Sequence, residues 1–180
     1  MEEIEYVKLS TENFCMNSLD NFKRYQKVTR CWRKHNDTYT LTPISYTEDW
    51  SLLELREVAE KILKALCSGN VAFGAVCGGE IIGFALIERE SFGSENQYVD
   101  LAEFYVSAPF QRKGIGKKLF GLSCGAAKEF GAKKLYISAH SAKESIAAYR
   151  SYGCVSALEI NRVLAEKEPC DLQLEFDLYK

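Results

Sequence analysis

The sequence predicts a mixed α/β fold, in which helices pack on the faces of one sheet. Two observations predict it. From residue 98 onward, strand-like and helix-like segments alternate as strand, helix, strand, helix, strand. Before them, two apolar runs flank a Gly78-Gly79 turn and form a hairpin. The chain has 180 residues, 47% of them hydrophobic, and can bury about 70% of its unfolded surface in one core. We therefore expect a single domain over residues 1–180.

The first third of the chain predicts one strand and a helical region. Residues 4–9 alternate in character as an opening strand does, and Ser10 or Thr11 is expected to cap a helix. Through Asn13–Trp32, apolar residues recur every three to five positions, which predicts one or two amphipathic helices.

A short strand and a second helix are expected next. The run Thr38–Ile44 is rich in β-forming residues, and Pro43 is expected to end it. Apolar residues from Leu52 to Leu66 then follow helical spacing, and Gly69-Asn70 ends that helix.

The remaining elements are more regular. Tyr98–Val106 is apolar on both faces, as expected for a strand that helices cover. The predicted strands are residues 71–77, 81–88, 98–106, 134–139 and 171–178, and the predicted helices are residues 114–130 and 142–152.

Composition narrows the class of protein. The 23 Lys and Arg residues nearly balance the 25 Asp and Glu residues, so a nucleic-acid-binding protein is disfavoured. The longest apolar runs are far shorter than the ~20 residues that cross a bilayer, so no membrane span is expected. The start of the chain lacks the features of a secretory signal, and none of the seven cysteines has zinc-knuckle or redox-pair spacing. We therefore expect a cytoplasmic protein with unpaired thiols and no metal site.

A phosphate-binding turn is the most informative segment. Residues 107–114 connect a strand to a helix whose first turn carries Gly114 and Gly116. Free amides and the positive end of the helix dipole favour phosphate oxygens there, and the glycines allow close approach. Four basic residues surround the turn, and they are Arg112, Lys113, Lys117 and Lys118. Leu119 stands where a dinucleotide fingerprint needs a third glycine, and the Gly-Lys-Ser/Thr of a P-loop is absent.

At these residues the sequence resembles the GNAT superfamily of acyl-CoA-dependent N-acetyltransferases. Gln111-Arg112-Lys113-Gly114-Ile115-Gly116 fits the family pattern Gln/Arg-x-x-Gly-x-Gly/Ala, and residues 145–154 resemble its Ala-x-x-Phe-Tyr-x-x-x-Gly-Phe motif. The chain departs from the family at Ala142, Ala148 and Cys154, where the family often has Asn and two aromatics. The likeness covers about residues 70–155. It implies a mostly antiparallel sheet of six to seven strands that splays at a cofactor cleft and is flanked by helices.

The resemblance also implies acetyl-CoA as co-substrate. It implies an acceptor-side region over residues 1–69, an acetyl-CoA-binding core over 70–155 and a C-terminal strand region over 156–180. The backbone of the bulged strand before the turn is expected to pair with pantetheine, and the turn is expected to hold the pyrophosphate. The implied cofactor-binding residues are Phe104, Tyr105, Val106, Gln111, Arg112, Lys113, Gly114, Ile115, Gly116, Lys117 and Ser145.

Acetyl transfer to an amine needs a proton acceptor for the amine and a proton donor for the departing thiolate. Asp100 and Glu103 are the candidate bases. Strand alternation would point them to opposite faces, and we favour Glu103, which lies nearer the expected bulge. Tyr149 occupies the family's position for the acid. His140 is a second candidate base, although a solitary histidine is more often a loop or capping residue. Cys124 and Cys154 lie near the cofactor region, and small buried thiols are their expected role.

The acceptor is expected to be a small-molecule or peptide amine, bound by the first 70 residues and the end of the chain. The five acids of residues 48–60 favour a cationic acceptor, and aromatic residues at 32, 39, 46 and 50 are candidates to line its cleft. We expect an N-acetyltransferase that acts by direct transfer. An aminoglycoside or other amine-drug acetyltransferase and a non-catalytic CoA-binding module remain alternatives. A homodimer also remains open, because the terminal strand, Leu172–Leu178, would extend a sheet across it.

Overall fold

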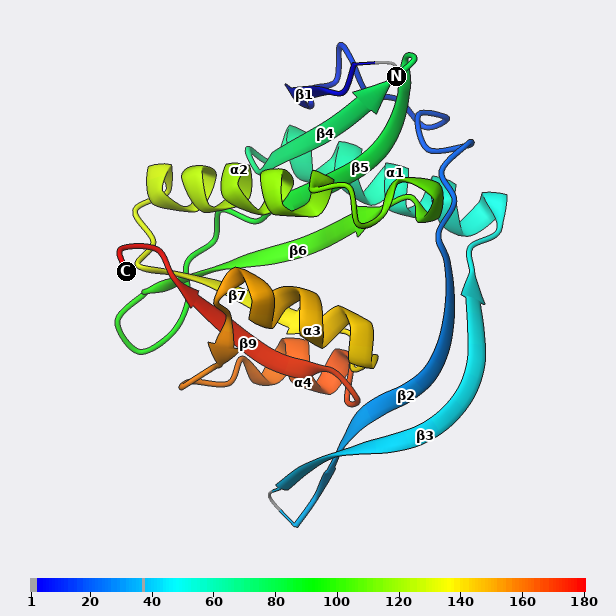
Figure 1. The fold of residues 1–180 in the computed structure, drawn as a ribbon. Coiled ribbons are helices and arrows are strands. Elements are labelled where there is room, and N and C mark those ends of the chain that lie inside the picture. Colours follow the sequence, from blue (N-terminus) through cyan, green and yellow to red (C-terminus); the bar gives the residue numbers. More distant parts are fainter. Residues whose placement is uncertain (1–2, 37) are drawn as a thin grey trace.

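A seven-stranded sheet forms the centre of the protein in the computed structural model, which describes residues 3–36 and 38–180 (Figure 1). All neighbouring strands are antiparallel except β6 and β7, which run parallel. This confirms the mixed, mostly antiparallel fold. In spatial order the strands are β1 (Glu5–Lys8), β4 (Val71–Cys77), β5 (Glu80–Ile87), β6 (Tyr98–Val106), β7 (Lys134–Ala139), β9 (Leu172–Asp177) and β8 (Val155–Ser156).

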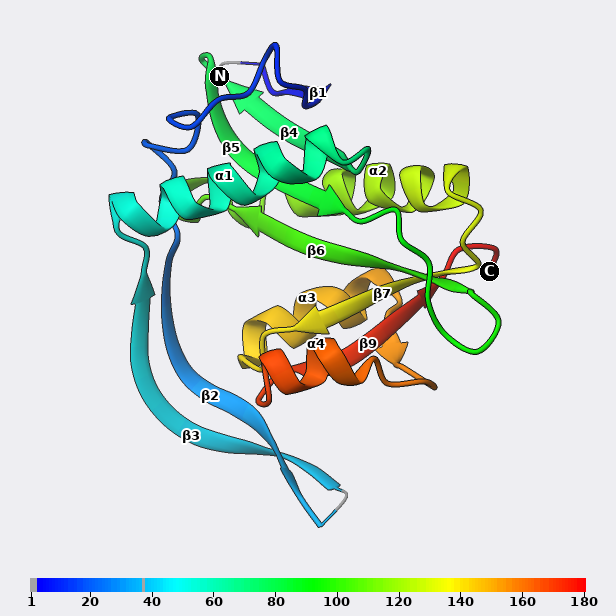
Figure 2. The same cartoon turned by 180° about the vertical axis from the view of Figure 1, so that it is seen from behind.

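Within the part of the chain that the structure describes, four helices cover the two faces of this sheet. In Figure 2, α1 (Leu52–Cys67) and α4 (Arg162–Lys167) lie in front of the strands, whereas α2 (Ile115–Glu129) and α3 (Lys143–Tyr152) lie behind them. The core follows the same division. One apolar cluster joins α1 to β4 and β5, and another joins α2 and α3 to the strands on the opposite face. We call these two sides the α1/α4 face and the α2/α3 face.

Helix α1 begins at a capping box. The Ser51 side chain accepts from the Glu54 amide, and the Glu54 carboxylate accepts from the Ser51 amide. Such a cap contributes about 1 kcal/mol to helix stability. Its apolar face, with Leu55, Ala59 and Ile62 buried, packs against the sheet.

Residues 13–32 do not form the predicted helices. Residues 11–21 form successive turns, and Ser10 accepts hydrogen bonds in a turn instead of capping a helix. The apolar side chains that suggested a helix are nevertheless buried, with Phe14, Leu19 and Phe22 at most 3% exposed. Turns therefore bring these side chains to the core at the same spacing that a helix would.

A long two-stranded ribbon takes up the rest of that region. Strands β2 (Tyr25–His35) and β3 (Thr38–Asp49) pair only with each other as strands, and they curve along one side of the main sheet (Figure 1). Pro43 does not end the strand as predicted. It lies opposite Arg30, next to a register shift, where a missing ladder hydrogen bond is tolerated.

The sheet opens between β6 and β7. These strands pair only over the three residues from Tyr98 to Asp100, which face residues 134–136. Beyond Asp100, β6 pairs with β5 alone, and beyond Tyr136, β7 pairs with β9 alone. The two strands therefore form a V with Asp100 at its vertex, and this opening is the splay that the resemblance implied.

The terminal strand is not a free edge. β9 pairs with β7 along one side and with β8 at Leu174 and Glu175 along the other. Extension of the sheet across a dimer would need an edge that β8 partly occupies. Among the described residues, no helix is long and apolar enough to cross a membrane.

Candidate acetyl-transfer site

A bulge in β6 sets which side chains face the two sides of the V. Leu86 pairs with Glu103 and Ile87 pairs with Leu101, so Ala102 is the extra residue. The bulge reverses the alternation of side chains along the strand. As a result, Asp100 and Glu103 lie on the same face, and their predicted placement on opposite faces is wrong. Both point to the α1/α4 face, where Glu103 contacts Lys61 of α1.

Each arm of the V presents polar side chains on the α1/α4 face. β6 contributes Asp100, Glu103 and Tyr105, and β7 with its following loop contributes Ser138 and His140. The alternate residues, such as Phe104 and Ile137, belong to the apolar cluster on the α2/α3 face. The two sides of the opening therefore differ in chemistry, since one is polar and the other is apolar and aromatic.

Asp100 and Glu103 have different surroundings. The Glu103 carboxylate is paired with Lys61 at 2.6 Å. Asp100 is 7% exposed, and its Oδ1 is inaccessible and accepts no hydrogen bond from the described residues. Burial raises the pKa of Asp100 to about 7, and the negative charge of Glu88 adds to the shift. A carboxylate with this pKa suits a general base near neutral pH, so the geometry favours Asp100 over the predicted Glu103.

Tyr149 approaches the opening from the α2/α3 face. It is carried by α3, and its ring lies 5.8 Å from that of Phe104. Burial raises the pKa of the Tyr149 hydroxyl well above its usual value, so the hydroxyl stays protonated at neutral pH. Asp100 and Tyr149 thus flank the V from its two sides. Ser145, one turn earlier on α3, is half-buried.

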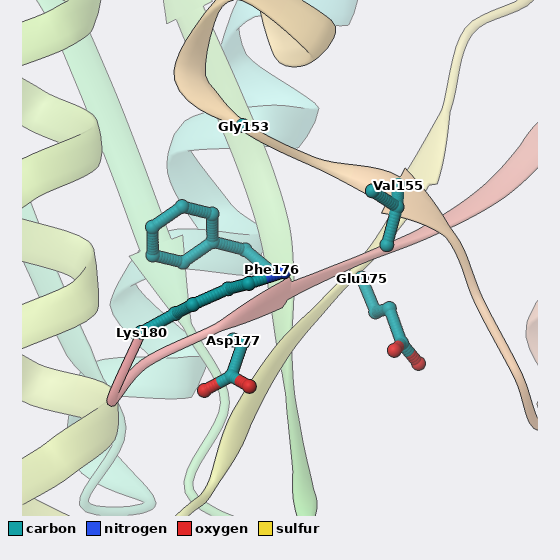
Figure 3. Close-up of a pocket in the computed structure, with 6 residues that line it drawn as sticks. All are labelled: Gly153, Val155, Glu175, Phe176, Asp177 and Lys180. Atoms are coloured by element: carbon teal, nitrogen blue, oxygen red, sulfur yellow. The ribbon is translucent and has the colours of Figure 1, made fainter.

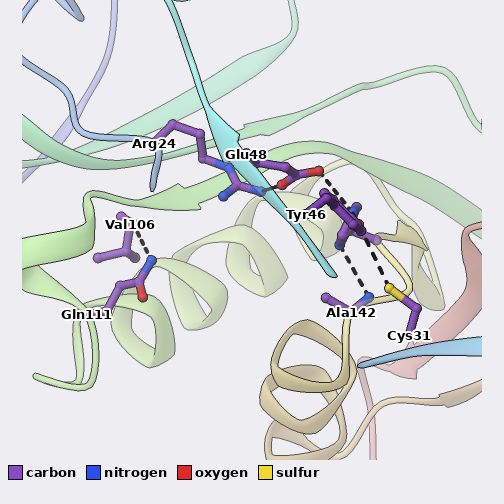
Figure 4. A network of polar contacts seen from close by, with 8 residues as sticks. Arg24, Cys31, Tyr46, Glu48, Val106, Gln111 and Ala142 are labelled. Carbon is purple, nitrogen blue, oxygen red and sulfur yellow. Dashed lines mark hydrogen bonds and ion pairs between the residues drawn. The ribbon is translucent and has the colours of Figure 1, made fainter. Parts of the chain in front are cut away.

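The turn of residues 107–114, at which we expect phosphate to bind, connects a strand to a helix as predicted. Arg112 and Gly114 both have positive φ, at 59° and 83°, and Gly114 is the N-cap of α2. No side chain caps this helix and its first turn carries no acid, so its leading amides are open to an anion. Gln111 donates from its side chain to the Val106 carbonyl and ties the turn to the end of β6 (Figure 4). The Ile115 side chain is buried at 1% exposure, which leaves only its backbone for a ligand.

Gly116 packs closely against α3. A Cβ at this position would lie 2.8 Å from the Tyr152 hydroxyl, so a larger residue would have to displace the Tyr152 side chain. Arg112, Lys113 and Lys117 are exposed around the turn, and the Lys113 ammonium lies 5.0 Å from the centre of the Phe110 ring.

Two shallow hollows lie next to this region on the α2/α3 side. One, of about 440 Å³, is lined by α2, the end of α3 and the end of the chain, and includes Lys117, Lys128 and Tyr152. The other lies at the end of β9, with Phe176 and Lys180 among its lining residues (Figure 3). The two share Phe176 and Lys180; the hollow along α2 is lined by three lysines, Lys117, Lys128 and Lys180, whereas the hollow at the end of β9 also has the acids Glu175 and Asp177 in its lining.

A polar network holds the ribbon against the open end of the V. Glu48 on β3 accepts from Arg24 and contacts His140 Nε2 at 3.0 Å (Figure 4). The Tyr46 hydroxyl also lies 3.0 Å from His140 Nε2, and the Ala142 amide donates to its Nδ1 at 3.3 Å. Because both ring nitrogens of His140 are engaged, this residue fits an anchoring role better than that of a base.

Arg24 is a buried cation at the edge of the same face. It is 8% exposed, its Nε has no hydrogen-bond partner among the described residues, and its guanidinium lies over the rings of Trp50 and Tyr105. The hydrogen bond to the Glu48 carboxylate lowers the cost of burying this charge. Of the four aromatics considered for the acceptor cleft, Trp50 and Tyr46 lie here, Trp32 packs toward α3, and Tyr39 is exposed at 42%.

The two thiols near the cofactor side, Cys124 and Cys154, are poorly suited to act as nucleophiles. Burial raises the pKa of Cys124 to about 11 and that of Cys154 to about 12. Among the described residues, no two cysteines form a disulfide, and no group of His, Cys, Asp and Glu is arranged to hold a metal ion.

Sequence reasoning missed Arg24, Glu48 and Asp171 as site residues. Asp171 immediately precedes β9 on the α1/α4 face, where it accepts from the Ser138 hydroxyl at 3.3 Å. In the sequence, Glu48 stands out only as one acid of an acidic segment. The β-rich composition of residues 38–49 could have identified its strand, but nothing local indicates that the ribbon folds back against His140.

A sheet that splays beside a phosphate-binding turn is the arrangement that the resemblance implied for acetyltransferases that use acetyl-CoA. The model of the acetyltransferase (GNAT) family matches residues 32–154, and the chain belongs to this family. A comparison with curated protein sequences finds no match.

Solved structures of acetyltransferases share the fold over almost the whole chain. Nourseothricin acetyltransferase superposes with a TM-score of 0.72 at 16% identity, over 97% of this chain and 98% of that one. A putative streptothricin acetyltransferase from Bacillus anthracis, in complex with acetyl coenzyme A, has a TM-score of 0.65 at 18% identity over 96% of each chain. The PaiA N-acetyltransferase of Thermoplasma acidophilum, in complex with coenzyme A, gives 0.62 at 16% identity over 97% and 99%.

Proposed function

We propose that this protein is a cytoplasmic N-acetyltransferase that moves an acetyl group from acetyl-CoA directly to a primary amine. The observation that carries the proposal is the placement of Asp100 and Tyr149 on opposite sides of the V. One group is a buried carboxylate whose Oδ1 has no partner among the described residues, and the other is a partly buried phenol whose raised pKa keeps it protonated. An amine and a thioester that meet in the opening would have a proton acceptor, Asp100, on one side and a proton donor, Tyr149, on the other.

The α2/α3 side is suited to acetyl-CoA. The unpaired edge of β6 from Phe104 to Val106 offers backbone groups to an amide-bearing arm. The open amides of α2 and the side chains of Arg112, Lys113 and Lys117 suit the pyrophosphate, and Lys128 and Lys180, which line the hollow along α2, suit the adenosine phosphates. Two solved acetyltransferases with this fold were determined in complex with acetyl coenzyme A or coenzyme A, which supports acetyl-CoA as the co-substrate.

The α1/α4 side is suited to the amine. Asp100 would take a proton from the acceptor nitrogen as the N–C bond forms, and Tyr149 would donate one to the thiolate as the C–S bond breaks. Glu103 is paired with Lys61 and would contribute to the field of the site without moving a proton. Burial raises the pKa of the Cys124 and Cys154 thiols and makes them poor nucleophiles, which favours direct transfer over an acyl-enzyme.

An amine-drug acetyltransferase is the second candidate. It is favoured because nourseothricin and putative streptothricin acetyltransferases superpose over nearly the whole chain, the ribbon region included. The third candidate, a CoA-binding module without turnover, would keep the phosphate-binding turn but would have no need of a buried carboxylate such as Asp100.

Thiol release from acetyl-CoA tests the proposal. We expect release with a panel of primary amines, a loss of at least about 100-fold in kcat/KM for Asp100→Asn, and retained activity for Glu129→Gln, a matched change at the exposed end of α2. Acetyl-CoA binding in calorimetry without release across amines, aminoglycosides and peptides would support the module. A failure to bind acetyl-CoA would contradict all three functions.

A further inference from the structure

The start of α3 is held by the ribbon. Its N-cap residue is Ala142, whose methyl side chain accepts no hydrogen bond, so within the part of the chain that the structure describes this helix has no side-chain cap. The ribbon binds the loop before it instead: the Trp32 amide donates to the Ser141 carbonyl at 2.8 Å, and the Arg33 guanidinium donates to the Ser141 hydroxyl at 2.6 Å. Ser141 and Ala142 are at most 3% exposed. Contacts with the ribbon therefore set the position at which α3 begins.

His140 connects this loop to the second strand of the ribbon. The Ala142 amide donates to its Nδ1 at 3.3 Å, so in the neutral ring the proton lies on Nε2. Nε2 is 3.0 Å from the Glu48 carboxylate on β3 and donates to it. The hydrogen bond from His140 lowers the pKa of Glu48 against the effect of burial, and the charge of Arg24 adds to the shift, so Glu48 stays a carboxylate at neutral pH. Figure 4 shows Arg24 and Glu48 in contact. One tautomer of His140 thus satisfies both neighbours.

Tyr149 lies on the helix that this chain of contacts reaches. It follows Ala142 by seven residues, which is about 10 Å along α3 at ~1.5 Å per residue. A helix moves as a stiff unit over this length, so a shift or rotation of its start displaces the Tyr149 ring relative to the opening of the V. A displacement of about 1 Å can lower a reaction rate by about 100-fold. The contacts of His140 therefore bear on the position of the expected proton donor.

We propose that His140 is a positioning residue for acetyl transfer: it ties the start of α3 to Glu48, so that the Tyr149 hydroxyl lies where the thiolate departs. The inference rests on the proposed function, in which Tyr149 is the acid. His140 keeps the same protonation state throughout and exchanges no proton with the reactants. The phosphate-binding turn has its own tie, from Gln111 to the end of β6, so loss of His140 should lower kcat and leave the binding of acetyl-CoA unchanged.

Removal of the His140 side chain tests the inference. In His140→Ala both contacts are lost, and we expect kcat to fall by about tenfold, with the KM for acetyl-CoA within about twofold of normal. His140→Asn is the second variant. Its shorter side chain accepts from the Ala142 amide, as Asn does in turns, but falls short of Glu48, so the loss of kcat should be similar while the loop is kept. Glu48→Gln keeps an acceptor oxygen for Nε2 and should retain kcat within about threefold of normal.

A double-mutant cycle shows whether His140 acts through Tyr149. Added to Tyr149→Phe, His140→Ala should lower kcat by no more than about twofold further, because the group that it positions has lost its hydroxyl. A residue with a purely structural role would instead cause its full loss again. Normal kcat in His140→Ala or His140→Asn, or the full further loss in the double variant, would overturn the inference and leave amine acetylation intact.

Hydrogen exchange without substrate distinguishes this inference from the proposed function. The amides of residues 143–149 should exchange faster in His140→Ala than in the unmodified protein. His35→Ala, at the exposed second histidine on β2, is the matched control and should change neither the exchange nor the rates. If the unmodified protein acetylates no amine, the proposed function fails. Exchange then decides the inference, because equal exchange in His140→Ala and the unmodified protein contradicts it.

Discussion

Asp100 couples the stability of the fold to pH. In the folded protein its pKa is raised to about 7, first by burial and then by the charge of Glu88, whereas in the unfolded chain it lies near 3.8. Between these values the folded state binds a proton that the unfolded state has lost, so the free energy of unfolding decreases as the pH rises from about 4 to 7.

The substitution Asp100→Asn removes this pH dependence of the free energy of unfolding. We expect the variant to gain stability relative to the unmodified protein between about pH 5 and pH 8, by roughly 1–3 kcal/mol. Urea unfolding at both pH values measures it, and an equal difference at both would contradict the buried environment of this carboxylate.

Tyr149 tests the other half of the chemistry. Because burial keeps its hydroxyl protonated, the proton it donates to the thiolate should be available over the whole accessible pH range. Tyr149→Phe should lower kcat by about 100-fold with little change in acetyl-CoA binding. Tyr179→Phe, at an exposed position near the C-terminus, is the matched control. If the rate falls less than threefold and the pH profile is normal, Tyr149 is not the acid.

Alanine substitutions at Gly114 and Gly125 separate the cost of an unfavourable backbone conformation from the cost of a steric clash. A Cβ added at either position would meet no atom within 4 Å, but Gly114 has a φ of 83° and Gly125 lies inside α2 with an ordinary φ. Gly114→Ala should therefore lower the free energy of unfolding by about 1 kcal/mol, and Gly125→Ala should raise it by about 0.5–1 kcal/mol. Chemical denaturation of both variants checks this pair, and equal signs would contradict the left-handed cap of α2.

At the residue scale, local patterns predicted the cofactor side better than the acceptor side. The turn from Gln111 to Gly116 is continuous in sequence, and its spacing alone indicates a strand, a glycine-rich turn and a helix start. Asp100 and Glu103 were both identified as candidate bases. Their relative orientation depends on the bulge at Ala102, which cannot be predicted from the regular alternation of side chains along a strand. The partners that distinguish them come from distant elements, since Lys61 lies on α1.

At the scale of elements, the ribbon is the part that sequence periodicity predicted wrongly. In residues 13–32, apolar side chains at intervals of three to five fit a helix, yet Val28 and Cys31 are buried from a strand, beside the loop after β7. The register shift between Val28 and Arg30 places the side chains of Val28 and Cys31, three positions apart, in one buried cluster. The hairpin of β4 and β5 was predicted correctly because its signal is local: two apolar runs flank the Gly78-Gly79 turn.

Docking of the ribbon should control acceptor binding. Trp32 fixes it to α3, with the Arg150 guanidinium 5.0 Å from the centre of the Trp32 ring, and its amide donates to Ser141. Trp32→Ala removes most of the side-chain contact, so we expect faster hydrogen exchange in β2 and β3. The KM for the amine should rise by about tenfold, with acetyl-CoA affinity within about twofold of normal.

Tyr39→Ala provides the control for that experiment. Tyr39 lies on the same ribbon but is 42% exposed, so the change should leave both affinities as they are. If Trp32→Ala weakens acetyl-CoA and the amine equally, the ribbon supports the whole sheet and is not a wall of the acceptor side alone.

At the scale of the whole molecule, the net charge and the local charge predict opposite effects of salt. The formal net charge is −2, so a uniform field would repel the polyanionic CoA, and screening by salt would lower the KM for acetyl-CoA. The exposed cluster of Arg112, Lys113, Lys117 and Lys118 has the reverse effect, because it attracts phosphates at the start of α2. Since screening acts within about 10 Å at moderate salt, the cluster should dominate.

We therefore expect the KM for acetyl-CoA to rise several-fold between about 0.05 and 0.5 M sodium chloride, with kcat nearly constant. Arg112→Gln with Lys113→Gln should raise the KM at low salt and flatten its dependence on salt. Lys27→Gln with Lys34→Gln, on the ribbon, changes the net charge by the same amount at a distance from the turn and should leave the slope intact. A KM that falls with salt, or equal slopes in the two double variants, would show that the total charge of the protein governs the encounter with acetyl-CoA and that the phosphate-binding turn does not.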